Sequence, residues 1–183
     1  MGRLLIGIAI VAAVSAAGDY VWYEIGVEHR MWAGIVHGAV LLTAVGGTLG
    51  AATGRAFVGL PMGTVAGVAG ALTYYALQPV LRSAAMLVAW ASLWIVLALL
   101  DGRLVRRAKR SLRLCLIQGM TAALLSGVTF YLVVASLWGR PPAGGRNYAI
   151  QFGLWAIAWA PGILAIGQDL GRAKSSQKSE VRS

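Results

Sequence analysis

Apolar residues run along the chain in six stretches of about 20 residues, separated by short polar or glycine-rich breaks. The hydrocarbon core of a bilayer is about 30 Å thick, and about 20 helical residues cross it. The pattern therefore predicts an all-α fold, an integral membrane bundle of six transmembrane helices. The predicted helices are Leu4–Tyr23, Met31–Thr53, Phe57–Leu77, Ser83–Leu100, Leu114–Trp138 and Tyr148–Gly167.

The breaks between the predicted helices have local causes. Glu24–Arg30 is charged, Gly54 begins a short turn, Pro79 lacks a backbone donor, and Gly139–Gly145 is rich in Gly and Pro. The longest polar break is Asp101–Arg113. Residues 1–171 are thus expected to form a single six-helix transmembrane domain. Residues 172–183 lack apolar periodicity, and we expect a basic, polar, disordered cytoplasmic tail there.

The first stretch admits a second interpretation. Arg3, an apolar run to Val14 and the small residues Ser15 to Ala17 imitate a cleavable signal peptide. Apolar and aromatic character resumes up to Tyr23, which gives the stretch membrane-spanning length. We expect a spanning helix, and cleavage stays open as the alternative.

Composition supports a membrane protein. Hydrophobic residues make up 58% of the chain and charged residues 12%, with a mean hydropathy of +0.73. One small soluble core cannot bury so much apolar surface. The net charge of +10 does not indicate nucleic-acid binding, because the basic residues are confined to gaps between apolar stretches. The single cysteine, Cys115, excludes an internal disulfide and a cysteine-based zinc cluster.

Basic residues also predict the orientation. With six crossings, one side carries twelve Lys and Arg residues and the other carries four. Cytoplasmic loops retain positive charge, so both termini are predicted to be cytoplasmic. Short loops and a high Ala and Gly content favour a bacterial plasma membrane, or the endoplasmic reticulum in a eukaryote. Aromatic residues that prefer the membrane boundary gather at the opposite, outer end: Tyr20, Trp22, Tyr23, Trp32, Tyr74, Tyr75, Trp138 and Tyr148.

Glycines recur at multiples of four residues in the second and third stretches. Small residues let helix backbones approach closely, which is how helices associate in lipid. We therefore expect these two helices to pack tightly; a hinge or substrate path is the alternative, and the same seams would also suit a homo-oligomer. The two rows are Gly34, Gly38, Gly46, Gly50 and Gly54, and then Gly59, Gly63, Gly67 and Ala71.

Ionisable residues within apolar stretches are candidates for function, because a charge leaves water at a cost of several kcal/mol unless it is paired. Asp19 and His37 both lie about one helical turn from the outer boundary. An antiparallel pair of helices would bring them to comparable depth, where a carboxylate could hold an imidazole proton. The full set of predicted ligand-binding residues is Asp19, Tyr23, His37, Tyr74, Gln78, Gln151 and Trp155.

Three interpretations of this outer polar layer stay open. It could be an interfacial ring of side chains that reach to water, or a pocket for a lipid head group or another small polar ligand. The third is a metal or proton-transfer site. Its candidate residues would be Asp19, Glu24, Glu28, His29 and His37, although the adjacent Glu28 and His29 diverge on a helix and no His-x-x-x-His spacing is present. We predict neither a metal nor a cofactor.

Enzyme motifs are missing from the sequence. It contains no Gly-x-Ser-x-Gly, no phosphate-cradling loop and no acidic pair of the kind that holds magnesium in lipid phosphotransferases. Catalysis is disfavoured. The densest basic cluster is Arg103–Arg113, which would attract anionic lipid head groups at about 1 kcal/mol per charge. A contact with a membrane-protein partner is the alternative for this loop, through Arg103, Arg106 and Arg107.

The second half of the chain resembles the Insig family of membrane proteins. The similarity rests on Trp90-Ala91-Ser92-Leu93-Trp94 before Asp101-Gly102-Arg103, and on Trp159-Ala160-Pro161-Gly162 before Gly171-Arg172. Gly102 departs from the family's Asp-Arg turn, and the regions of Asp19 and His37 have no match in it. The resemblance implies a non-enzymatic bundle with a lipid- or sterol-accommodating cavity, and a partner-binding role for Asp101. Alternatively, Asp101 ends a helix and pairs with neighbouring arginines.

The sequence is therefore consistent with three alternative functions. The leading hypothesis is a non-enzymatic, Insig-like protein that binds a lipid or sterol-like ligand between its helices. The second is a small proton-coupled transporter that uses Asp19 and His37. The third is a membrane-embedded enzyme with a Glu and His site on the outer face.

Overall fold

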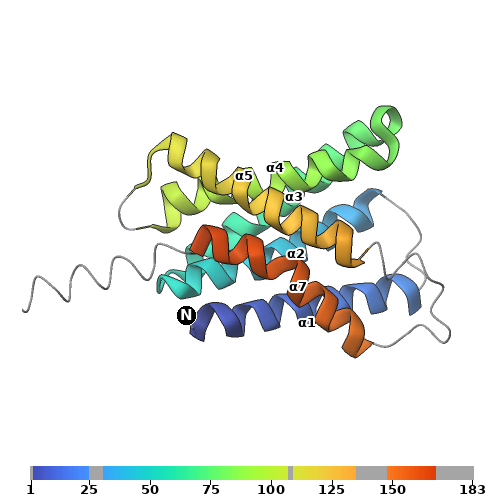
Figure 1. Cartoon of the computed structure of the whole chain (residues 1–183), viewed down its shortest axis with the longest axis horizontal. Helices are drawn as coiled ribbons and strands as arrows, with labels where there is room; N and C mark the ends of the chain where they lie inside the picture. Colours follow the sequence, from blue (N-terminus) through green and yellow to red (C-terminus); the bar gives the residue numbers. More distant parts are fainter. Residues whose placement is uncertain (1, 25–30, 107–108, 135–147, 168–183) are drawn as a thin grey trace, which may run out of the picture.

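The computed structural model describes residues 2–24, 31–106, 109–134 and 148–167, and gives the backbone alone for 22–24, 133 and 134. This part of the chain is helical and contains no strand (Figure 1). The predicted tail, 172–183, lies outside it. The elements are α1 (Gly2–Glu24), α2 (Met31–Ala52), α3 (Ala56–Leu81), the 3₁₀ turn η1 (Arg82–Ala84), α4 (Ala85–Leu100), the π-helical turn η2 (Asp101–Val105), α5 (Leu112–Thr129), the π-helical turn η3 (Phe130–Val134) and α7 (Tyr148–Gly167).

Five helical runs in the described residues are long and apolar enough to cross a membrane. This confirms the prediction of a helical, membrane-embedded protein. One run, Ala56–Val105, is 50 residues long and contains both α3 and α4. The other four are Gly2–Val21, Met31–Ala52, Leu112–Leu132 and Tyr148–Gly167.

The helices form a closed ring. Each packs against the next one along the chain, and α7 returns to pack against α1, which lies beside it in Figure 1. At one end of the bundle, a Cβ on Gly167 would lie 2.9 Å from the side chain of Leu4. The first turn of α1 and the last turn of α7 therefore lie together at the same end of the bundle.

Glycines bring α2 and α3 into backbone contact, as their spacing predicts. A Cβ on Gly46 would collide with the carbonyl oxygen of Gly59, and a Cβ on Gly67 would collide with that of Gly38. A Cβ on Gly59 would lie 2.9 Å from the Cα of Gly50. Because these neighbours are backbone atoms, side chains cannot be accommodated, and the tight packing of the two helices is confirmed. Gly54, with φ of +75°, makes the turn between them.

Helix α3 continues past the point where the sequence predicts its end. The expected break at Gln78 and Pro79 is wrong, because the helix extends to Leu81. A proline removes one hydrogen bond, and a helix among other apolar helices tolerates that loss. The chain turns instead at Arg82, which has φ of +50°, and its backbone N–H donates to the carbonyl of Gln78.

Apolar side chains cover the outer surface of the bundle as well as filling its interior. The interior holds large side chains such as Trp94, Trp159 and Ile163, all essentially inaccessible. Large apolar side chains also cover the outer surface, and the side chain of Phe57 at the start of α3 is 92% exposed. A soluble monomer rarely exposes so much apolar surface, whereas hydrocarbon solvates it without cost.

Candidate functional site

A groove of about 400 Å³ runs between α1 and α2, and we call it the His37 groove. Its walls are apolar apart from His37 and the indole of Trp32, and they include Val14, Ala17 and Val40. Val14 to Val21 rise about 10 Å along α1, so the groove occupies the half of the helix nearer its carboxyl end.

Gly18 sets the depth of this groove. The imidazole of His37 packs directly over it: a Cβ on Gly18 would collide with Cε1 of His37 and lie 2.9 Å from Nδ1. Any larger residue at this position would push the imidazole away from α1. The sequence pointed to His37 but not to the glycine that makes room for its ring.

The next residue, Asp19, faces a different helix. Successive side chains on a helix point about 100° apart, and the Asp19 carboxylate accepts a hydrogen bond from the indole Nε1 of Trp155 at 2.7 Å. One turn earlier on α1 and one turn later on α7, Ser15 accepts from Nε1 of Trp159 at 3.0 Å. The Ser15 hydroxyl in turn donates to the carbonyl of Val11.

These four side chains form a two-rung polar ladder between α1 and α7, buried on both helices. Asp19 and His37 lie at a common level along the bundle, as predicted, because Gly18 and His37 are in contact. The sequence predicted that the Asp19 carboxylate could hold the imidazole proton of His37. The hydrogen bond that the structure describes for this carboxylate is instead with Trp155 on α7. The sequence indicated Asp19 and Trp155 separately, but not that they pair.

Aromatic rings fill the bundle behind the ladder. The ring of Trp159 stacks on those of Trp90 and Trp155, with centroids 4.9 and 6.2 Å apart. Phe130 stacks on Trp90 at 4.9 Å. These rings come from α4, η3 and α7, and their contacts leave the interior packed. The open space beside the predicted outer layer is the His37 groove.

The remaining predicted ligand residues lie apart from that groove. Tyr74 packs edge-on against Tyr75 on α3, with centroids 5.1 Å apart, and Gln78 is exposed near the end of α3. Gln151 lies one turn before Trp155; its Oε1 is buried and has no hydrogen-bond partner among the described residues. The side chain of Tyr23, like Glu28, His29 and Arg107, lies outside the described part of the chain.

No protein-family model, curated protein or solved structure matches this chain. Within the described ranges, no three His, Cys, Asp or Glu residues are grouped so that they could hold a metal ion. The His37 groove offers apolar walls and one imidazole, which suits an apolar ligand with one polar group.

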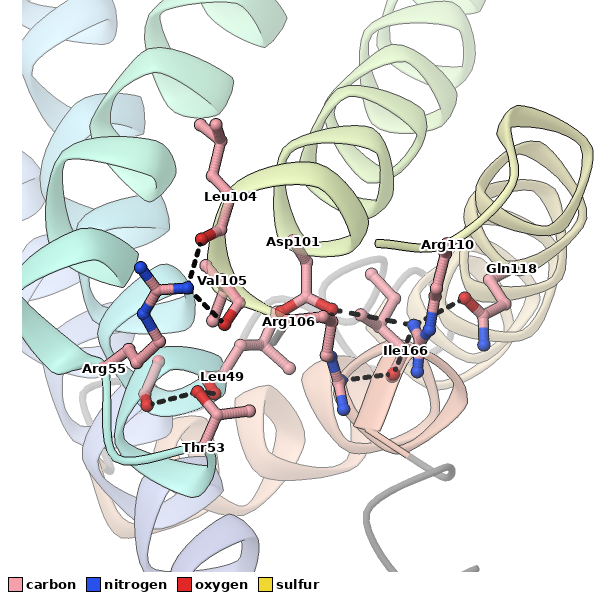
Figure 2. Close-up of polar contacts among 11 residues, drawn as sticks. Leu49, Thr53, Arg55, Asp101, Leu104, Val105, Arg106, Arg110, Gln118 and Ile166 are labelled. Carbon is pink, nitrogen blue, oxygen red and sulfur yellow. Dashed lines mark hydrogen bonds and ion pairs between the residues drawn. The ribbon is translucent and has the colours of Figure 1, made fainter. Parts of the chain in front are cut away.

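The opposite end of the bundle carries a buried ionic cluster (Figure 2). Asp101, at the end of α4, is fully buried, and its Oδ2 accepts from Nε of Arg106 at 2.7 Å and lies 3.6 Å from Nη1 of Arg110. Both arginines also donate to the carbonyl of Ile166, at 2.9 and 3.4 Å, and Arg110 donates to Gln118 at 2.6 Å.

This cluster caps α7. The carbonyl of Ile166 belongs to the last turn, where orphan acceptors and the negative end of the helix dipole favour cations. Asp101 thus has the arginine pairing that the sequence allowed as one alternative. Nearby, Arg55 donates to the carbonyls of Leu104 and Val105, which ties the α2–α3 turn to η2 (Figure 2). Arg103, the other predicted partner-binding residue in the described part, is exposed.

Proposed function

We propose that the chain crosses the membrane six times and has both ends in the cytoplasm. A straight helix of 50 residues would be about 75 Å long, more than twice the roughly 30 Å of a bilayer core. The run Ala56–Val105 instead turns at Arg82, and α3 and α4 pack against each other. Counting them as two crossings supports an even number, and the distribution of basic residues supports the orientation.

We propose further that the protein is a non-enzymatic membrane protein that binds a lipid or sterol-like ligand in the His37 groove. The observation that carries this proposal is the groove itself, whose volume of about 400 Å³ is within the usual range for ligand pockets, about 300–1,000 Å³. It opens on the outer surface of the bundle, so a ligand could enter sideways from the bilayer. An Insig-like relationship would be consistent with such a site and remains a hypothesis.

His37 would orient the ligand. Its imidazole lies among aliphatic side chains and the indole of Trp32, which comes at the start of α2. A hydroxyl group can donate to or accept from a neutral imidazole, and an ester carbonyl can accept from its N–H, while the alkyl part contacts Val14, Ala17 and Val40. This arrangement favours a lipid with a small polar group over a multiply charged solute.

Analysis of copurified lipid tests the proposal. Protein extracted in mild detergent would retain one enriched lipid class, identified by mass spectrometry, and adding that class would raise the thermal stability. Ala17→Phe, which fills the groove, would lose the lipid. Ala13→Phe is the matched control, because Ala13 is exposed on the same helix outside the groove. No enriched lipid in the wild type, or equal retention by both variants, would contradict the proposal.

A further inference from the structure

A second groove lies on the same seam between α1 and α2, at the other end of the bundle. Its volume is about 360 Å³, and we call it the Arg3 groove after the cation that lines it. The side chain of Ile6 and the helix surfaces at Ala44 and Gly47 form its walls, and Leu60 of α3 closes one side. Among the described residues that line it, Arg3 is the charged one.

In a bilayer spanned by α1, the two grooves would lie in opposite leaflets. Gly2–Val21 is 20 residues, or about 30 Å of helix, which equals the thickness of the hydrocarbon core. The Arg3 groove follows α1 from Arg3 to Ile10, and the His37 groove follows it from Val14 to Val21. Each covers about 10 Å, within the roughly 15 Å depth of one leaflet.

The end of the Arg3 groove favours an anion. The Arg3 guanidinium has five N–H donors, and in the described part of the chain one of them makes a contact at the 3.5 Å limit, Nη1 to the carbonyl of Ala51. The side chain is exposed, in the first turn of α1. Ala56, which also lines the groove, begins α3. The amino-terminal ends of α1 and α3 thus add positive potential beside the guanidinium, against the negative potential of one carboxyl-terminal end, that of α2 at Ala51.

We propose that the Arg3 groove binds an anionic glycerophospholipid of the adjoining leaflet. The phosphate would contact Arg3, and one acyl chain would lie in the groove along Ile6 and Ile10. The exposed aromatic ring of Phe57, next to Ala56, would contact the lipid near the start of α3. This site is separate from the His37 groove, so the protein would hold one lipid in each leaflet.

Photolabelling in nanodiscs tests the second site. The full-length protein is reconstituted in phosphatidylcholine with a trace of phosphatidylglycerol, or of phosphatidylcholine, that carries a diazirine in its acyl chain, and adducts are mapped by peptide mass spectrometry. We expect phosphatidylglycerol to label residues 6–10 and 44–51 about fivefold more than phosphatidylcholine, which corresponds to about 1 kcal/mol for one basic residue. Equal labelling by the two lipids would overturn the proposal.

Matched variants separate the groove from general attraction to a basic surface. Arg3→Gln should remove the preference for phosphatidylglycerol, and Arg3→Lys should retain it. Lys109→Gln, which removes one exposed charge elsewhere, should leave it unchanged. Ile6→Trp should reduce labelling by both lipids, whereas Leu5→Trp, on an exposed neighbour outside the groove, should not. A preference that survives Arg3→Gln would overturn the proposal.

Adducts at residues 14–21 and 32–41 report the His37 groove in the same experiment. Their loss or persistence bears on the proposed function alone. Labelling confined to that groove would overturn the second site and leave the first intact. Labelling confined to residues 6–10 and 44–51 would do the reverse.

Discussion

Adding one methyl group at Gly63 should separate α2 from α3. A Cβ there would collide with the carbonyl oxygen of Leu42, and would lie 2.7 Å from its carbonyl carbon and 3.0 Å from the backbone nitrogen of Gly46. Ordinary contacts of a Cβ begin near 3.4 Å. Backbone atoms on both sides cannot move aside as a flexible side chain would, so the helices themselves must shift.

The expected cost follows from two opposing effects. Overpacking a close interface costs about 1–3 kcal/mol, and alanine recovers up to about 1 kcal/mol of helix propensity. Gly63→Ala should therefore lose about 1–2 kcal/mol, or roughly 2–8 °C in Tm for a chain of this size. Gly153→Ala is the matched control, because a Cβ on Gly153 would meet nothing within 4 Å. It should gain about 0.5–1 kcal/mol.

Thermal unfolding of the two variants in the same detergent, followed by tryptophan fluorescence, measures the difference. The opposite signs are the test, because both variants make the same chemical change in a helix. A Gly63→Ala variant that is at least as stable as the wild type, or an equal loss of stability in both variants, would contradict the predicted collision between α2 and α3.

Three further predictions concern polar contacts and the chain turn. Asp101→Asn leaves Arg106 and Arg110 buried without their counter-charge, and should lower the free energy of unfolding by denaturant by about 3–5 kcal/mol. Arg103→Gln, at an exposed site, is the control and should change this free energy by less than about 0.5 kcal/mol. A double-mutant cycle of Ser15→Ala and Trp159→Phe should give a coupling of about 0.6 kcal/mol, within the range found between membrane helices, and zero coupling would contradict the ladder. Arg82→Gly should raise the midpoint of unfolding, because a positive φ costs a non-glycine residue about 1–3 kcal/mol, more than the roughly 1 kcal/mol that glycine loses in the unfolded chain; a lower midpoint would contradict this.

Local chemistry made part of the fold predictable. The glycine rows predicted the α2–α3 contact because a missing Cβ has one structural meaning wherever a second backbone lies against it. The helix starts at Met31, after a charged break, and at Tyr148, after a glycine-rich break, are where the sequence predicts them. The predicted helix end at Trp138 lies outside the described residues. The helix end predicted at Pro79 was wrong, because the cost of losing one backbone N–H donor depends on neighbouring helices that the local sequence does not reveal.

The arrangement around the ring was harder to predict. Depth follows from counting residues, so Asp19 and His37 were correctly expected at one level. The direction in which each side chain points depends on which helices are neighbours. The packing of α7 against α1 joins residues more than 130 positions apart, such as Asp19 and Trp155, so no local pattern indicates it. The same applies to Ile166 as the acceptor for Arg106.

The His37 groove was also not predictable from local sequence. Polar residues drew the prediction toward Tyr74, Gln78 and Gln151, since ionisable and amide groups stand out in an apolar sequence. The open space is lined mainly by aliphatic side chains, which are indistinguishable in sequence from those that simply face lipid. A void arises from how two helix surfaces fail to meet, and residue type alone does not encode that.

Accessibility labelling tests the central claim, that the chain threads the membrane back and forth and turns at Arg82. In a Cys115→Ala background, single cysteines at positions 2, 83 and 109 are treated with an impermeant maleimide in right-side-out and inverted vesicles. We expect labelling of Gly2→Cys and Lys109→Cys from the cytoplasmic side, and of Ser83→Cys from the opposite side. Labelling of Ser83→Cys and Lys109→Cys from the same side would contradict it.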